Sequence, residues 1–216
     1  MRSRFDEQLA LLKKEMIEMG AMCEEAIALA ARALTEGNMT LAEKVAPLSQ
    51  NIDQMERDIE SRCLKLLLQQ QPVAKDLRVI SAALKMITDI ERIGDQAEDI
   101  TEILPYLAGR KLPDNIPVRE MAGGGIRMVT DSVDAYVKQD IDMAKSVIER
   151  DDIIDGYFAS IKQNLIDLLK NNTDSGEFAI DLLMIGKYLE RIGDHAVNIA
   201  EWVIFSVTGM HKEVQS

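Results

Sequence analysis

The sequence has 216 residues, of which 47% are hydrophobic and 4% aromatic, and its formal net charge is −12. A chain of this length can bury a substantial core, and its few aromatic residues and prolines, together with many helix-forming residues, indicate an all-α protein. The acidic balance argues against a nucleic-acid groove, because phosphate binding requires clustered Lys and Arg.

Apolar residues recur at three- and four-residue spacing through most of the chain, which predicts long helices rather than strands. We expect six long antiparallel helices, over the approximate ranges 4–35, 40–70, 73–107, 118–138, 141–170 and 177–207. Gly37-Asn38 is expected to end the first helix, and Thr40 to cap the second. Gln71-Pro72 is expected to break the chain after the second helix, and Pro105 to kink the third.

Glycine and proline mark the connections in the second half of the chain. Residues 109–117 contain one glycine and two prolines and are expected to form a linker. The fourth helix contains the run Gly123–Gly125, in which each glycine costs about 1 kcal/mol relative to alanine. Such a run indicates a weak joint, a close contact with a neighbouring helix, or fraying near the helix start.

The chain contains an internal repeat. Ile90–Ile100 aligns with Leu189–Ile199, and both segments contain the sequence Glu-Arg-Ile-Gly-Asp at the same point of the third and sixth helices. Ile52-Asp53 likewise matches Ile154-Asp155, 102 positions further along. The sequence therefore predicts two tandem pseudo-repeated three-helix bundles, residues 1–108 and 118–216, joined by the linker 109–117.

Acidic residues form a stripe on both repeated helices, about 140° from the apolar face, so we expect them on the bundle surface. An arbitrary acidic stripe is usually a solvated face. Here the arrangement occurs twice, its i,i+4 acids repel one another, and the preceding helix of the second unit adds Asp151 and Asp155. Carboxylates from adjacent helices that converge in this way suit a hard cation with oxygen ligands, such as Mg²⁺, Ca²⁺, Mn²⁺ or iron.

We therefore expect a metal site in each unit. The candidate ligands of the second unit are Asp151, Asp155, Glu190 and Asp194, with Asn198 beside them. The candidates of the first unit are Asp53, Glu56, Glu91, Asp95 and Asp99. Ser49 stands where the second unit has Asp151, so the first site has one acid fewer and is expected to bind metal more weakly.

Zinc sites and membrane spans are disfavoured. The two histidines are His195 and His211, and His195 points away from Glu190, so we expect it to be hydrogen-bonded or exposed. Cys23 and Cys63 are far apart, which excludes a thiolate zinc site and suits a reduced, cytoplasmic protein. We see no transmembrane segment and no apolar leader in the sequence.

The double Glu-Arg-Ile-Gly-Asp motif, the segment Gln71–Arg78 and the Asp151-x-x-x-Asp155 element together resemble the PhoU family of bacterial phosphate-uptake regulators, over about Met1 to Thr208. The resemblance implies two tandem three-helix bundles. It also implies multinuclear metal clusters held by paired acidic motifs, which fall here on Glu91 and Asp95, Asp151 and Asp155, and Glu190 and Asp194.

The resemblance further implies a negative regulator of the phosphate regulon, which acts on the phosphate ABC transporter through its ATP-binding subunit and on a membrane-bound sensor histidine kinase. We also expect a homodimer that reaches the membrane only through its partners. We expect no enzyme, because the sequence has no Walker-type glycine-rich loop and no Gly-x-Ser-x-Gly motif. Two alternatives stay open: a di-metal helical-bundle oxidase, which normally uses Glu-x-x-His motifs, and a metal-free helical adaptor.

Overall fold

The computed structural model describes residues 2–69, 73–107 and 109–210. All regular secondary structure in these ranges is helical and no β-strand occurs in them, which confirms the all-α prediction. The long helices are α1 (Arg2–Glu36), α3 (Val45–Gln69), α4 (Ala74–Ile103), α5 (Val118–Lys138), α6 (Ile141–Asn171) and α7 (Gly176–Thr208). Three short helices connect them: α2 (Met39–Ala42), η1 (Leu104–Leu107) and η2 (Thr173–Ser175). None of the described helices is long and apolar enough to cross a bilayer.

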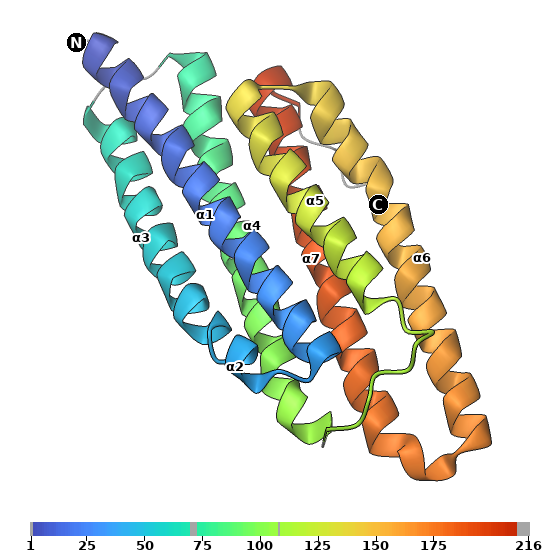
Figure 1. Ribbon diagram of the computed structural model, residues 1–216. Coiled ribbons are helices and arrows are strands. Elements are labelled where there is room, and N and C mark those ends of the chain that lie inside the picture. The colour runs from blue at the N-terminus through green and yellow to red at the C-terminus, as the bar shows by residue number, and fades with distance from the viewer. Residues whose placement is uncertain (1, 70–72, 108, 211–216) are drawn as a thin grey trace.

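The long helices form two sets of three that lie side by side (Figure 1). Helices α1, α3 and α4 contact one another, as do α5, α6 and α7. The sets meet where α4 runs antiparallel to α7 and where α1 lies against α5, so that α3 and α6 are the outer helices. The buried hydrophobic residues of both sets belong to one continuous core. The division at 109–117 into separate units therefore stays a prediction.

The predicted second helix, 40–70, is wrong in its first turns. The chain forms the short α2, turns at Glu43 and Lys44, and only then begins α3. Pro47 explains the interruption, because its nitrogen has no hydrogen to donate to the carbonyl of Glu43 and its ring would collide with that carbonyl. The predicted cap at Thr40 is also wrong: Asn38 caps α2, and its Oδ1 accepts a hydrogen bond of 3.1 Å from the Thr40 amide.

The other predicted helix ends fall within a few residues of the observed ones. The kink expected at Pro105 is a change from α-helix to the 3₁₀ turn η1, which begins one residue earlier, at Leu104. Asp140 caps α6, because its carboxylate accepts a hydrogen bond of 3.0 Å from the Met143 amide. The break expected at Gln71-Pro72 lies outside the described residues, as does His211.

The glycine run of α5 is a site of close helix packing. A Cβ atom on Gly124 would lie 2.6 Å from Cδ1 of Ile154 on α6, and one on Gly125 would lie 3.2 Å from Cγ2 of Ile192 on α7. Alanine at either position would crowd the isoleucine side chain that packs against it. Of the three interpretations of Gly123–Gly125, the structure supports the close contact.

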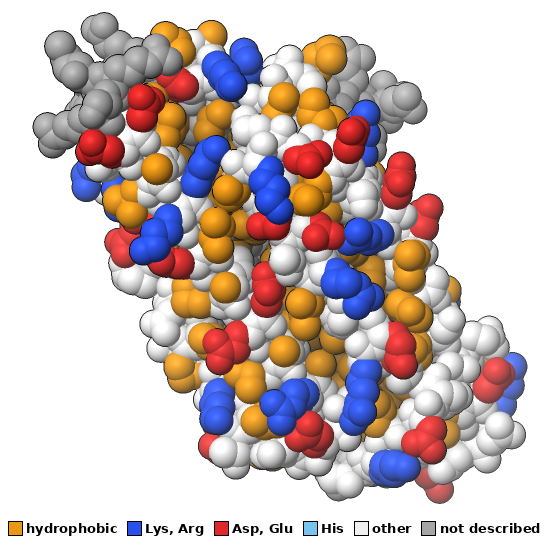
Figure 2. Space-filling model, turned by 45° about the horizontal axis from the view of Figure 1, so that its top comes forward, with side chains coloured by type: hydrophobic (Ala, Val, Ile, Leu, Met, Phe, Trp, Pro, Cys, Tyr) orange, Lys and Arg blue, Asp and Glu red, His pale blue; other side chains and the backbone are white. Residues whose placement is uncertain are grey.

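Charge is mixed over the face of the molecule shown in Figure 2. Lys and Arg side chains are interspersed with Asp and Glu, and hydrophobic side chains lie between them. Among the described residues on this face we see no continuous basic groove of the kind that nucleic-acid binding requires.

Candidate metal centres

The first candidate centre lies in the seam between α3 and α4. Asp53 of α3 and Glu91 and Asp95 of α4 each place one carboxylate oxygen within 4.8 Å of the others. Gly94 allows this approach, because a Cβ at that position would lie 2.9 Å from Cδ1 of Ile52, the neighbour of Asp53. The sequence predicted that Asp53 would meet this pair, and the structure brings them together.

Glu56 belongs to the same seam. Its Oε1 accepts a hydrogen bond of 3.2 Å from the Thr88 hydroxyl. Its charge also contributes to raising the pKa of Glu91, although burial and Asp95 contribute more. Glu56 is thus an electrostatic neighbour of Glu91, while the oxygens that lie within 4.8 Å of one another belong to Asp53, Glu91 and Asp95.

The second candidate centre lies at the repeat-related place between α6 and α7. Burial raises the pKa of Asp151 to about 6, with smaller contributions from the charges of Asp155, Asp194 and Glu190. A Cβ on Gly193 would lie 3.2 Å from Oδ1 of Asp151, so this glycine leaves room for the carboxylate. The four acids predicted for this centre are thus electrostatic neighbours.

Burial and neighbouring like charges raise the pKa of carboxyls in both centres. Burial is the largest cause of the raised pKa of Glu91, and the charge of Asp95 is the next. The pKa of Asp95 is raised by burial and then by the charge of Asp53. The pKa of Asp194 is raised by burial and then by the charge of Glu190. A raised carboxyl pKa means that the ionised form is disfavoured, and a bound cation would relieve that cost.

Each centre contains a buried carboxylate oxygen with no hydrogen-bond partner among the described residues. These atoms are Oδ1 of Asp53 in the first centre and Oδ1 of Asp151 in the second. A buried oxygen of this kind is costly unless a donor or a cation compensates it. Oxygen-only donor sets of this composition suit Mg²⁺, Mn²⁺ or iron, so the residues fit the metal that the sequence predicted.

Two of the predicted ligands, Asn198 and Asp99, lie at the contact between α4 and α7. Asn198 donates a hydrogen bond of 3.0 Å to Oδ1 of Asp89, and His195 Nδ1 lies 2.9 Å from the same oxygen. Asp99 lies close enough to Arg191 for their charges to interact. His195 is thus hydrogen-bonded, as expected. Asp89 was not predicted, because its repeat partner is Tyr188 and the repeat therefore does not mark it.

A cation lies beside the acids of each centre. Lys187 forms a hydrogen-bonded ion pair with Glu190, and its Nζ lies 5.6 Å from the centroid of the Phe158 ring. Arg92 lies 3.5 Å from Glu91 and 3.8 Å from Asp95. The three-residue spacing of Lys187 from Glu190 is the sequence signal that could have found the first pair.

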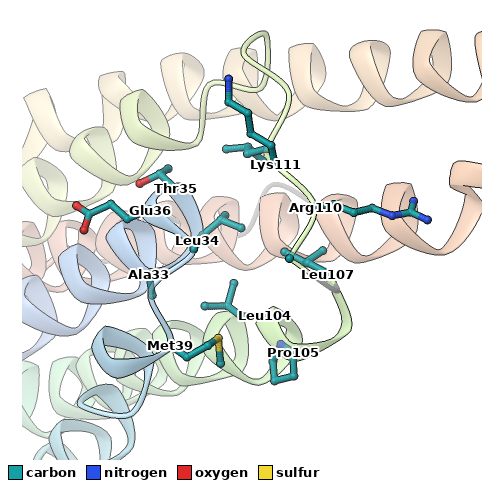
Figure 3. Close-up of a pocket in the computed structure, with 13 residues that line it drawn as sticks. Ala33, Leu34, Thr35, Glu36, Met39, Leu104, Pro105, Leu107, Arg110 and Lys111 are labelled. Carbon is teal, nitrogen blue, oxygen red and sulfur yellow. The ribbon is translucent and has the colours of Figure 1, made fainter.

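A pocket of about 380 Å³ lies where the end of α1, η1 and the linker meet (Figure 3). Leu34, Leu104 and Leu107 line it, while Arg110 points away from it. The Arg110 guanidinium lies 5.4 Å from the centroid of the Phe178 ring, and Lys111 pairs with Asp114 at 3.1 Å. Neither cation is thus directed at an anion inside this pocket.

Comparison with known proteins extends over nearly the whole chain. The model of the PhoU domain matches twice, over residues 16–104 and 118–203. A protein of Clostridium acetobutylicum named phosphate-specific transport system accessory protein PhoU homolog is 35% identical over 96% of each chain. A homologue from Thermotoga maritima is 33% identical over 95% of this chain and 89% of its own.

Solved structures agree with the sequence matches. The crystal structure of PhoU from Pseudomonas aeruginosa superposes with a TM-score of 0.90 at 32% identity, over 95% of this chain and all of that one. The crystal structure of the phosphate transport system regulatory protein PhoU from Streptococcus pneumoniae superposes with a TM-score of 0.87 at 26% identity, over 95% of this chain and 98% of that one. Both the repeated domain match and the full-length likeness place the chain in one family: it belongs to the PhoU family.

Proposed function

We propose that the protein is a negative regulator of phosphate uptake and of phosphate-starvation genes. It acts by contact with the ATP-binding subunit of a phosphate ABC transporter and with a sensor histidine kinase. The observation that carries the proposal is the likeness, over 96% of both chains, to a protein named as an accessory protein of phosphate-specific transport. Family membership makes the chain a regulator associated with phosphate transport and not an enzyme.

We further propose that both carboxylate centres bind divalent or trivalent metal ions. Each centre draws acids from an outer helix, α3 or α6, and from an inner helix, α4 or α7. A metal bound there would link the outer helix to the inner helix, α4 or α7, through which the two sets contact each other. The unpartnered oxygens of Asp53 and Asp151 support this role, because a cation would supply the partner that they lack.

The regulatory proposal is tested by deleting the gene from its bacterium and following a phosphate-starvation reporter together with phosphate uptake. We expect constitutive reporter expression and excessive uptake, both restored by a plasmid copy of the wild-type gene. Normal repression in a clean deletion with no second copy of the gene would contradict the proposal.

The proposed partners are tested by affinity capture from phosphate-replete cells. We expect the transporter ATPase and the sensor kinase to be retained, and membrane-fraction recovery of the protein to depend on them. We also propose a cytoplasmic homodimer, which analytical ultracentrifugation tests directly. A monomer at micromolar concentration, or membrane recovery without those partners, would contradict these proposals.

The oxidase alternative finds no support in the site. Its Glu-x-x-His motif is missing from the sequence, and His195, which follows Asp194 of the second centre, is hydrogen-bonded to Asp89. A metal-free adaptor differs from our proposal only in metal content, so metal analysis separates the two.

A further inference from the structure

Besides Ser49 and Asp151, the two centres differ at two further pairs of repeat-related positions. Thr88 in the first unit corresponds to Lys187 in the second, 99 positions further along, and Glu56 corresponds to Phe158, 102 positions further along. In the first centre the Thr88 hydroxyl donates to Glu56. In the second, Lys187 binds Glu190 and lies over the Phe158 ring. A neutral hydroxyl and an acid are thus replaced by a cation and an aromatic ring.

Lys187 is held firmly against Glu190. The Glu190 side chain is only 14% exposed and that of Lys187 is 37% exposed. Gly186 leaves room for the ring that lies under the ammonium group, because a Cβ at Gly186 would lie 3.4 Å from Cδ2 of Phe158. A charge-assisted hydrogen bond in a half-buried seam, with a cation–π contact beside it, is stronger than an exposed ion pair.

The cation of the first centre is held more loosely. Arg92 lies 3.5 and 3.8 Å from its two acids, and its side chain is 58% exposed. Exposed pairs at such distances contribute little and are screened by salt. The corresponding arginine of the second unit, Arg191, lies instead 6.0 Å from the centroid of the Tyr188 ring. Lys187 is therefore the cation that distinguishes the second centre.

We infer that Lys187 is an internal competitor for metal at the second centre. A metal ion has to displace the ammonium group to gain Oε2 of Glu190, or bind the other oxygen against the lysine's charge, whereas the oxygens of Asp53, Glu91 and Asp95 already lie within 4.8 Å of one another. The second centre consequently binds divalent cations more weakly than the first and is filled after it. This inference rests on the proposed metal binding. It reverses the order of affinities predicted from the sequence, in which the first centre was the weaker one because Ser49 stands where the second unit has Asp151.

The test uses the full chain in two backgrounds and titrates Mn²⁺ by calorimetry. Glu91→Gln with Asp95→Asn isolates the second centre, and Glu190→Gln with Asp194→Asn isolates the first. In the second-centre background, Lys187→Thr is expected to tighten Mn²⁺ binding about tenfold, since one charge-assisted hydrogen bond no longer has to be broken. Lys187→Arg keeps the positive charge and is expected to leave binding weak.

The reciprocal change provides an independent measurement. In the first-centre background, Thr88→Lys is expected to weaken Mn²⁺ binding by a similar factor, about tenfold. Unchanged affinities in both Lys187→Thr and Thr88→Lys, in chains shown by circular dichroism to be folded, would overturn the inference while leaving metal binding intact. Failure of Mn²⁺ to bind either centre of the wild-type chain would overturn both the inference and the proposed metal function.

Discussion

Asp89 of α4 holds His195 of α7, with 2.9 Å between Asp89 Oδ1 and His195 Nδ1. This contact joins the two sets of helices at the seam between the repeats. It also lies next to both centres along the chain, because Glu91 follows Asp89 by two residues and Asp194 directly precedes His195. Asn198 donates to the same oxygen, so a single carboxylate accepts from two side chains of the opposite repeat.

Asp89→Ala should therefore destabilise the protein. The substitution removes the carboxylate that accepts hydrogen bonds from His195 and Asn198. We therefore expect a loss of about 1–3 kcal/mol in the free energy of unfolding. Urea unfolding followed by circular dichroism measures it. Glu25→Ala, at an exposed position of α1, is the control and should change stability by less than about 0.5 kcal/mol. Equal stabilities of the two variants would show that the seam contact contributes nothing.

Gly193→Ala should damage the second centre. The added methyl group would lie 3.2 Å from Oδ1 of Asp151 and 3.3 Å from Cγ2 of Ile154, so these two side chains must shift by a few tenths of an ångström. We expect weaker Mn²⁺ binding by calorimetry and a loss of about 1–3 kcal/mol in thermal or urea unfolding.

Gly156→Ala is the matched control for Gly193→Ala. Gly156 lies on the same helix pair, but a Cβ there would have nothing within 4 Å. Alanine at this helical position should stabilise the fold by about 0.5–1 kcal/mol and leave metal binding unchanged. If Gly193→Ala were tolerated as well as this control, the close approach of α6 to α7 would not matter to the centre.

The stability of the metal-free protein should fall as the pH rises. The pKa of Asp151 is raised to about 6 by burial and neighbouring acids, so the folded protein holds this proton more tightly than the unfolded chain does. Stability is therefore lost between about pH 4 and pH 7, opposite to the behaviour of an acid that has a cationic partner. Thermal melts with a chelator should show this loss, and Asp151→Asn should reduce it. A stability that increases across this window would contradict the assignment.

Tyr136→Phe should weaken the link between α5 and α4. The buried Tyr136 hydroxyl donates a hydrogen bond of 3.1 Å to the Val79 carbonyl. Its loss should cost about 0.5–1.5 kcal/mol in urea unfolding. Tyr106→Phe removes a hydroxyl from a side chain that is 76% exposed and should be neutral. Identical midpoints for the two variants would rule out a stabilising role for the Tyr136 bond.

The repeat makes most of the fold predictable. A motif that occurs twice at the same helical position fixes the pairing of helices, and it thereby marks Glu91, Asp95, Glu190 and Asp194 in the sequence alone. Gly94 and Gly193 are part of the repeated motif, and both lie directly against the neighbouring helix. Periodicity does not predict the interruption after α2, because the apolar pattern continues through Pro47 and only the missing amide hydrogen of that residue marks the break.

The sequence could not show which charges meet across helices. Helical spacing places acids on a face but does not give the rotation of one helix against another, so the hydrogen bond from Asn198 of α7 to Asp89 of α4 could not be predicted. The ring beside the Lys187 ammonium group, Phe158 of α6, could not be identified either, although the three-residue spacing marks the Lys187–Glu190 pair within α7. These partners depend on tertiary packing, which periodicity does not encode.

Metal content measured by elemental analysis tests the central claim most directly. The wild-type chain is exposed to Mn²⁺ or Fe²⁺, passed through gel filtration and analysed beside the fourfold variant Glu91→Gln, Asp95→Asn, Glu190→Gln, Asp194→Asn. We predict that the wild-type protein retains metal and that the folded variant retains none. Equal metal content in the two chains, or none in the wild type, would contradict the account and return both acidic stripes to solvated helix faces.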